Sequence, residues 1–473
     1  MRSETDTTDH AAPSSTANPL HGRGRHGDLT SGPVQGHLVR LSVPMIWGIL
    51  AIVASQLVNT FYISMISPAH LAAISFTFPV TMTVLSLIIG LGIGMSSVVS
   101  RAIGEGNHDT VVRLSSHGLI LAVIAGVIMA LAGHAIMDPL FRAMGATDDM
   151  MPMVLDYMGL WFTGIVFITV PMVGNSAIRA TGDTLTPALI MMGTTAFLVV
   201  LDPLLIFGLF GLPRMEMHGA ALATIISYGL SMIVALWILK YKKRIIFQDG
   251  LHLDQFGDSA RRLLFIALPA GITSTIQPMT SGVLTAILAQ SGTHAVAAFG
   301  VATRVEAFAF IVIMALATGM SPILGQNWGA RRFDRVHETL RLAIRFCVLW
   351  SVAVAAILMI GAYPLAGLFS TDAETVRMTA LYFLIVPFSY AAGNLVPGWS
   401  SAFNAIGLPQ RSAAMIGVKM IIVQIPLAFI GNHFFGVIGV FTSIAIANIG
   451  TGLYYHWRNK QHMTTAELAH SPA

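Results

Sequence analysis

The fold is decided by the stretch from Leu38 to Asp109, because the chain contains a second version of it. The first version ends in GLGIGMSSVVSRAIGEGNHD at residues 90–109, and ALATGMSPILGQNWGARRFD occupies residues 315–334. The matching residues lie a constant 225 positions apart, as Asp334 does from Asp109. The same register joins Pro44 to Pro269, Pro139 to Pro364, Tyr157 to Tyr382, and Gly182 to Gly407. The chain is therefore an internal duplication, a pattern typical of secondary transporters.

Composition places the chain in a membrane. Of its 473 residues 55% are hydrophobic and only 10% are charged, and the mean hydropathy is +0.74. Soluble domains carry roughly 25% charged residues, so this chain could not cover its own surface in water. Its pI near 9.3 reflects basic loops of a membrane protein and predicts no nucleic-acid partner. The single cysteine, Cys347, excludes an intrachain disulfide and matches no metal-ligand spacing.

Apolar runs long enough to cross a bilayer follow one another from residue 38 onward. The sequence predicts an all-α membrane protein with twelve transmembrane helices. They are expected at residues 38–64, 70–101, 111–136, 150–177, 185–209, 218–239, 261–289, 295–326, 337–361, 375–403, 412–432 and 436–456. An even number of helices in each repeat gives both repeats the same orientation, so the two halves are parallel and related by an axis along the membrane normal.

The remaining segments are hydrophilic and divide the chain into lobes. Residues 1–36 are expected to be a disordered cytoplasmic tail, followed by an N-terminal six-helix lobe at 37–240. Residues 241–258 form a cytoplasmic linker, 259–458 the C-terminal lobe and 459–473 a second cytoplasmic tail. The basic cluster Lys240–Arg244 at the start of the linker anchors the topology, or alternatively binds anionic lipid.

Basic residues are distributed unequally between the two sets of loops that alternate along the chain. Three lie in the loops of one set: Arg142, Arg214 and Arg377. Sixteen are assigned to the other set: Arg101, Arg113, Arg179, Lys240, Lys242, Lys243, Arg244, Arg261, Arg262, Arg331, Arg332, Arg335, Arg341, Arg345, Arg411 and Lys419. Cytoplasmic loops are enriched in Lys and Arg. We therefore expect a multi-pass protein of the cell inner membrane with both termini in the cytoplasm.

Asp202 is the first candidate for a functional site, because a charged side chain within a span is costly. It lies about 25 Å along the fifth span, and Asn59 lies about 30 Å along the first span from the same side. Tyr62 shares a helical face with Asn59. These residues predict a polar pocket between helices 1 and 5 that binds a cation or exchanges a proton. Alternatively, Asp202 caps a helix bent at Pro203, and Asn59 makes a structural interhelical hydrogen bond.

Glu306 is the second candidate, about 17 Å from the outer end of the eighth span. Its repeat counterpart is Thr81, so this carboxylate belongs to one half only. It could bind an ion, carry a proton or oppose a cationic substrate. Arg304 points to another side of the same helix, and a structural Arg–Glu pair formed through other helices is the alternative. Gln277 and Asn394 are further candidates for lining a cavity.

The motifs resemble those of the MATE family, the multidrug and toxic compound extrusion transporters. The resemblance covers about residues 37–456. It is carried by Pro44, by the end of the second span from Gly94 through Gly104 to Asp109, by its echo Gly325–Arg331, by Arg179–Asp183 and by Asp202–Leu204.

The resemblance implies antiport in which a Na⁺ or H⁺ gradient drives export of amphipathic, often cationic compounds through a cleft between two six-helix lobes. In prokaryotic members an Asp of helix 1 and an Asp of helix 5 form a cation site. Here Asp202 matches the second position, whereas Asn59 stands at the first and Leu198 replaces an Asn one turn before Asp202. Members with a C-lobe Na⁺ site carry a carboxylate on helix 7, and the nearest position here is the neutral Gln277. We infer, independently of the resemblance, that Glu306 is the acid that compensates for it.

The leading hypothesis is thus a cation-coupled exporter of drugs or metabolites that acts as a monomer among membrane lipids, with H⁺ or Na⁺ as coupling ion. Na⁺ could bind at Asp202 or Glu306, and we expect no other metal and no cofactor. The runner-up is a lipid-linked precursor flippase, although such proteins line their cavities with several basic residues. A channel or receptor suits duplicated lobes less well. The chain has no P-loop and no hydrolase motif, so we expect no enzyme.

Overall fold

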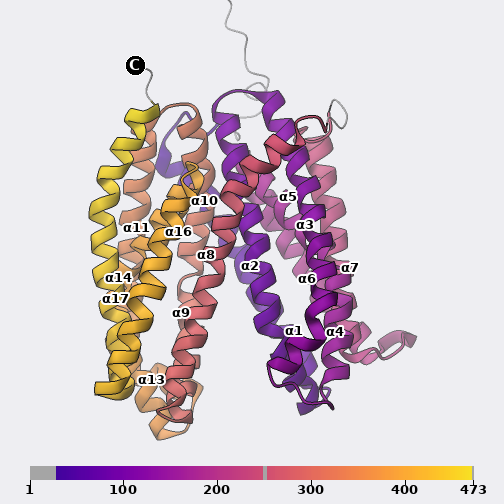
Figure 1. The fold of residues 1–473 in the computed structure, drawn as a ribbon, viewed down its shortest axis with the longest axis vertical. Coiled ribbons are helices and arrows are strands. Elements are labelled where there is room, and N and C mark those ends of the chain that lie inside the picture. Colours follow the sequence, from indigo (N-terminus) through magenta and orange to yellow (C-terminus); the bar gives the residue numbers. More distant parts are fainter. Residues whose placement is uncertain (1–27, 249–252, 471–473) are drawn as a thin grey trace, which may run out of the picture.

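A computed structural model describes residues 28–248 and 253–470, with side chains described as far as residue 463. Every secondary-structure element in these ranges is a helix (Figure 1). The first lobe contains α1 (Val34–Ser64), α2 (Pro68–Gly104), α3 (His108–Ala143), α4 (Met151–Thr163), α5 (Ile165–Ala180), α6 (Leu185–Phe207), the short η1 (Leu209–Gly211), α7 (Glu216–Trp237) and the π-helical turn η2 (Ile238–Lys242).

The second lobe is more often interrupted. It contains α8 (Phe256–Ala289), α9 (Thr293–Ala309), α10 (Ile311–Gly329), α11 (Phe333–Ile360), α12 (Ala362–Phe369), α13 (Ala373–Ile385), η3 (Pro387–Ser389), α14 (Tyr390–Gly393), α15 (Leu395–Ala405), α16 (Pro409–Gly417), the π-helical η4 (Val418–Gln424) and α17 (Ile425–His470).

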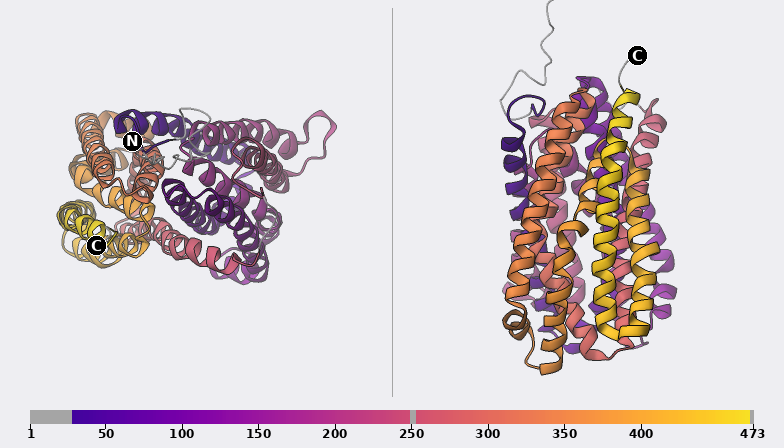
Figure 2. Two further views of the ribbon diagram at one scale, coloured as in Figure 1. Left: turned by 90° about the horizontal axis from the view of Figure 1, so that it is seen from above. Right: turned by 90° about the vertical axis from the view of Figure 1, so that its left-hand side faces the viewer.

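The expected twelve spans are confirmed. By length and hydropathy, nine helical segments of the described chain can cross a membrane, and two bent pairs, α4–α5 and α9–α10, each make one more. The last segment, Pro409–Met463, contains two spans because the chain reverses at Gly436 (φ 57°, ψ −139°). Ser443 Oγ donates to the Leu427 carbonyl at 2.6 Å, whereas these residues would lie about 24 Å apart along a straight helix. Figure 2 shows the two antiparallel arms side by side.

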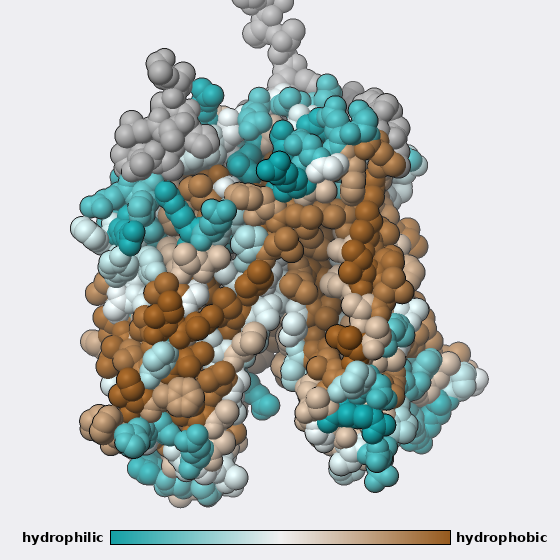
Figure 3. Space-filling view, viewed as in Figure 1, coloured by the Kyte–Doolittle hydropathy of each residue, from teal (hydrophilic) through white to brown (hydrophobic). Residues whose placement is uncertain are grey.

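The two lobes meet at one end and diverge toward the other. Figure 3 shows the resulting hollow, open at the end opposite the start of α1 and the end of α17, between two walls with an apolar band on their outer faces. Polar side chains gather at both ends of the molecule in the same view. The shape is that of a two-lobed membrane protein closed at one face, which we call the closed end, and open at the other, the open end.

Repeat-related glycines let the lobes approach at the closed end. A Cβ on Gly104 of α2 would overlap the carbonyl oxygen of Gln326 on α10, and one on Gly329 of α10 would overlap that of Arg101 on α2. Gly104 and Gly329 are repeat counterparts, and so are Arg101 and Gln326. The contact is therefore reciprocal about the axis that relates the halves.

The same exchange continues along the interface. A Cβ on Gly94 would lie 3.0 Å from Cβ of Ala267 on α8, and one on Gly319 would lie 2.7 Å from Oγ of Ser42 on α1. Hydrogen bonds add to the glycine contacts at the closed end. Ser97 Oγ donates to the Asn404 carbonyl at 2.5 Å, across the lobe boundary.

A segment before α1 fastens the first lobe to the second. Leu29 is fully buried among α10, α11 and α15, and its N–H donates to Gln326 Oε1 at 3.2 Å. Its carbonyl accepts from Asn327 Nδ2 and from Arg335 Nη2, both at 3.1 Å. The expected tail at 1–36 is therefore too long at its end: residues 28–36 are ordered by these contacts, while residues 1–27 lie outside the described residues.

The other expected boundaries shift for similar reasons. α17 extends to His470 within the expected tail at 459–473, because Asn459 and Met463 are buried against the second lobe. In the linker, Ile245 and Ile246 are buried against the first lobe, and Lys243 Nζ lies 2.7 Å from Asp183 Oδ2. Although burial acts to raise it, the pKa of Asp183 is held below its ordinary value by the hydrogen bond from Lys243 and by those from Thr186.

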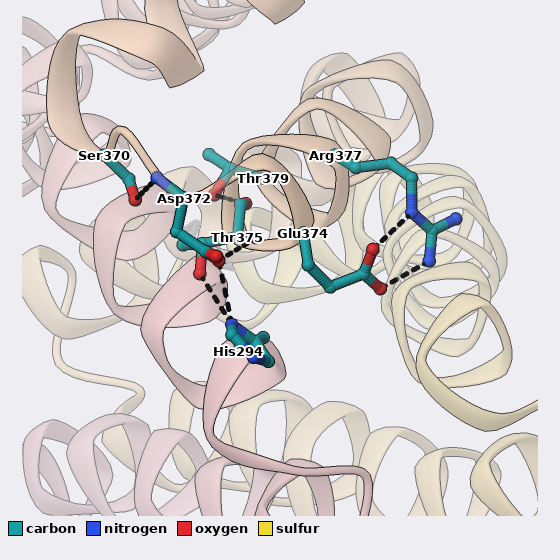
Figure 4. Close-up of polar contacts among 7 residues, drawn as sticks. All are labelled: His294, Ser370, Asp372, Glu374, Thr375, Arg377 and Thr379. Atoms are coloured by element: carbon teal, nitrogen blue, oxygen red, sulfur yellow. Dashed lines mark hydrogen bonds and ion pairs between the residues drawn. The ribbon is translucent and has the colours of Figure 1, made fainter.

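At the open end, a polar cluster joins α9 to the turn before α13 (Figure 4). Asp372 Oδ2 caps α13 by accepting from the Thr375 N–H at 2.8 Å and lies 2.8 Å from His294 Nδ1 on α9. Hydrogen bonds from Thr375 and the nearby imidazole hold the pKa of Asp372 below its ordinary value. Arg377 binds both carboxylate oxygens of Glu374, at 2.9 and 2.6 Å. These contacts fix the rim of the second lobe.

Replacing Gly104 or Gly329 with Ala should separate α2 from α10, because the added Cβ meets a backbone oxygen that cannot move aside alone. The test uses a pair of cysteines, one in each lobe at the closed end, introduced in a Cys347→Ser background. We expect this pair to cross-link less efficiently in the Gly→Ala variants than in the protein that keeps both glycines. Gly282→Ala is the matched control, since a Cβ there meets nothing within 4 Å. Unchanged cross-linking in both glycine variants would contradict the reciprocal contact.

Candidate functional site

The structure brings Asp202 and Asn59 together in the first lobe. Asn59 Nδ2 on α1 donates to Asp202 Oδ2 on α6 at 2.9 Å. Asp202 is 1% exposed, and its other oxygen, Oδ1, is buried without a hydrogen-bond partner among the described residues. A buried carboxylate with one unsatisfied oxygen is suited to take up a proton or to contribute a ligand to a cation.

Aromatic side chains enclose this pair. Tyr62 packs edge-on against Phe207 with ring centroids 6.3 Å apart, and the buried Tyr157 of α4 lies within electrostatic reach of Asp202. Ser55 is buried on α1, where its hydroxyl donates to the Ile52 carbonyl of its own helix at 2.8 Å. The polar contact between α1 and α6 thus consists of Asn59 and Asp202.

Glu306 lies in a separate polar cluster in the second lobe. Its Oε1 accepts hydrogen bonds from Tyr382 Oη at 2.7 Å and Tyr390 Oη at 2.6 Å. Both tyrosines are buried, at 2% and 3% exposure. Tyr382 is the repeat counterpart of Tyr157, so equivalent tyrosines lie near the carboxylate of each lobe.

Lys419 belongs to the same cluster, contrary to its expected place in a loop. It is 6% exposed within η4, and its Nζ donates to the Gly393 carbonyl at 3.0 Å. The loop assignment was wrong, since the span expected at 412–432 already included Lys419, and the helix begins even earlier, at Pro409, which places Lys419 about 15 Å into it. This depth, together with the apolar neighbours Met420 and Ile421, is the sequence signal that could have identified it.

The other predicted residues lie apart from these two clusters. Arg304 is exposed on α9 and forms no ion pair with Glu306 or another described carboxylate, so the alternative of a structural Arg–Glu pair does not hold. Gln277 is exposed on α8. Asn394 is partly buried and donates to Ser351 Oγ on α11 at 3.0 Å, inside the second lobe.

Irregular helices surround the second cluster. α9 and α10 meet at 43° around Phe310, one turn after Glu306. Tyr390 begins the four-residue α14, which η3 precedes, and Lys419 lies in the π-helical η4. Broken helices and π-helical turns commonly occur at functional sites. No group of three or more His, Cys, Asp or Glu suited to a metal ion occurs in the described part of the chain.

Comparison with known proteins identifies the two halves. The family model MatE matches residues 44–204 and again residues 269–430, in the register of the internal duplication. The chain belongs to the MATE family. It is therefore a multi-pass membrane transporter and not an enzyme. Its two lobes correspond to two copies of the family's repeat unit.

Individual relatives agree with this assignment. The FAD transporter of Shewanella oneidensis is 36% identical over 433 residues, which cover 91% of this chain and 96% of the relative. The multidrug export protein MepA of Staphylococcus aureus is 26% identical over 446 residues, 92% of this chain and 97% of that protein. These MATE relatives do not favour the flippase alternative.

A solved structure shares the architecture over most of its length. The MATE transporter VcmN of Vibrio cholerae, in its bent form, aligns with a TM-score of 0.85 and 28% identity. The alignment covers 92% of this chain and 98% of that structure. The two-lobed, twelve-helix fold is thus common to this chain and to solved MATE transporters.

Removing the Asn59 amide should destabilise the protein through Asp202. In Asn59→Ala the buried carboxylate loses its one hydrogen bond, at a cost of about 1–3 kcal/mol. Thermal unfolding in detergent should give a lower Tm for Asn59→Ala than for wild type. Adding Asn59→Ala to the Asp202→Asn variant should lower the Tm much less. Ser55→Ala is the control, because Ser55 bonds only to its own helix. Additive effects of the two substitutions would contradict a direct coupling.

Proposed function

We propose that this protein is a cation-coupled antiporter that exports small amphipathic molecules by alternating access of its two lobes. The observation that carries the proposal is the buried Asp202, whose Oδ1 lacks a partner while Asn59 holds Oδ2. A proton or Na⁺ that binds there satisfies the carboxylate and changes the contact between α1 and α6. Because α1 also packs on α10 of the other lobe, ion binding can be transmitted to the closed end.

We further propose that the closed end faces the cytoplasm, so that the structure is open to the outside. Most of the basic loop residues support this orientation, because their loops lie at the closed end and cytoplasmic loops are enriched in Lys and Arg. Substrate would leave through the hollow seen in Figure 3. Return to the inward-open state would require the glycine contacts at the closed end to separate.

Efflux from proteoliposomes tests the coupling. A pH gradient and a Na⁺ gradient are applied separately, and export of a cationic dye is compared among wild type, Asp202→Asn and Glu306→Gln. We expect gradient-driven efflux in wild type and its loss in Asp202→Asn, because an amide neither gains a proton nor carries the charge that attracts a cation. Glu105→Gln, at the end of α2, is the control for loss of an acidic residue.

Loss of efflux in Glu306→Gln alone would instead assign the coupling to the second lobe. If neither gradient drives dye or metabolite export by the wild-type protein, the proposed function fails.

A flavin dinucleotide is a second candidate substrate, and two observations favour it. The relative from Shewanella oneidensis is an FAD transporter, and its identity to this chain is 36%. In addition, Arg304 is exposed on α9 with no hydrogen bond or ion pair to another described residue. An exposed Arg within a span is costly in lipid, so we place it on the water-filled side. A guanidinium binds phosphate oxygens in pairs, which suits a diphosphate.

Arg304→Gln should reduce FAD efflux by about ten-fold while leaving efflux of a cationic dye unchanged or increased, since it removes a positive charge. Arg304→Lys should restore part of the FAD efflux. Arg377→Gln is the matched control, because Arg377 at the open end is already bound to Glu374. Equal losses for FAD and for the dye would assign Arg304 a structural role and reject this candidate.

A further inference from the structure

The polar cluster of the second lobe contains a buried lysine that the coupling scheme above does not use. Lys419 and Glu306 come from different spans, η4 and α9, and both contact the same short helix. Tyr390, the first residue of α14, donates to Glu306, and Gly393, the last residue of α14, accepts from Lys419. One turn of helix thus lies between a carboxylate and an ammonium group.

The hydrogen bonds to Glu306 are one-sided. Both tyrosine hydroxyls donate to Oε1, and Oε2 has no hydrogen-bond partner among the described residues. The structure therefore leaves one oxygen of this carboxylate open to a proton or a cation.

Lys419 is the buried cation that binds the same short helix as this carboxylate. Its Nζ donates to the carbonyl of Gly393, three residues after Tyr390, whose hydroxyl donates to Glu306. Arg304, two residues away, points elsewhere and forms no pair with it. The two groups make no direct ion pair, but Lys419 is buried and Glu306 half-buried, and each charge is costly to hold away from water without an opposite charge nearby.

We propose that Lys419 is a resident counter-cation for Glu306, so that this cluster exchanges protons and does not bind Na⁺. The inference rests on the proposed antiport and deepens it, because it names the ion taken by the second lobe. A Na⁺ ion on Oε2 would need further oxygen ligands in place of its hydration shell, but Lys419 offers no acceptor and already occupies the Gly393 carbonyl.

A proton adds the same charge as Na⁺, but it needs only the one oxygen that the cluster leaves open. It adds to Oε2 and converts the carboxylate into a neutral carboxylic acid, so the net charge of the cluster changes from zero to +1. The attraction between Lys419 and Glu306 across α14 is then lost. Release of the proton to water regenerates the carboxylate and the attraction, and no further reactant is required.

The first test is a double-mutant cycle on the full-length protein in detergent at neutral pH. Glu306→Gln and Lys419→Gln should each lower the Tm, because each leaves one uncompensated charge in the interior. The double variant should recover most of the loss, and Lys419→Arg, which keeps the charge, should remain close to wild type. Additive losses in the double variant would overturn the pairing.

The second test measures Na⁺ binding, which a structural role for Lys419 would not affect. Asp202→Asn is the background throughout, so that the first lobe contributes no Na⁺ site. Replacing KCl with NaCl at constant ionic strength should not shift the Tm of this background. Adding Lys419→Gln should create a Na⁺-dependent increase in Tm, and adding Glu306→Gln as well should abolish it.

The proposal would be overturned if NaCl raised the Tm of the Asp202→Asn variant but not that of Asp202→Asn/Glu306→Gln. Such a result would show that Na⁺ binds to Glu306 beside Lys419. This comparison leaves Lys419 in place, so it decides the question even if the lysine variants do not fold. Neither test requires transport. Failure of efflux with an intact Lys419–Glu306 coupling would therefore reject the proposed function and leave the pairing standing.

Discussion

The structure depends on one close approach, in which Gly104 of α2 meets the Gln326 carbonyl of α10 while Gly329 of α10 meets the Arg101 carbonyl of α2. A side chain at either glycine would keep the two lobes apart. Because this contact lies at one end of long helices, it holds that end closed while the lobes diverge at the other. The buried Leu29 and the Ser97 hydrogen bond reinforce the same contact. The hollow between the lobes follows from this geometry.

The duplicated halves have kept this interface and have diverged in their polar interiors. Asp202 corresponds to Leu427 in the second half, and Glu306 corresponds to Thr81 in the first. Each lobe holds one candidate coupling carboxylate, on a different helix and with different hydrogen-bond partners: an amide in the first and two tyrosines in the second. The tyrosines Tyr157 and Tyr382 remain at equivalent positions. The two lobes are therefore equivalent in packing and distinct in chemistry.

Much of the fold could be predicted from the sequence, because hydropathy and an internal repeat depend on residue type and spacing alone. The twelve spans follow from apolar runs, and depth along a helix was enough to place Asn59 near Asp202. The partners of Glu306 could not be predicted in this way. They are brought together by a helix break, the short α14 and a π-helical turn, which the apolar sequences around Phe310 and Lys419 do not reveal. The ordered segment at Leu29 depends on contacts with the other lobe, almost 300 residues away in sequence.

The reciprocal glycine contact also bears on ancestry. An interface in which residue i of one copy meets residue j of the other, and j meets i, is that of a symmetric homodimer. A single six-helix unit with Gly104 and Arg101 could form the whole contact with a second copy of itself, before any linker joined the two. In a single chain that carries both copies, each half can lose or gain charged residues independently. The present asymmetry of the two carboxylates is a change that an obligate homodimer could not have made.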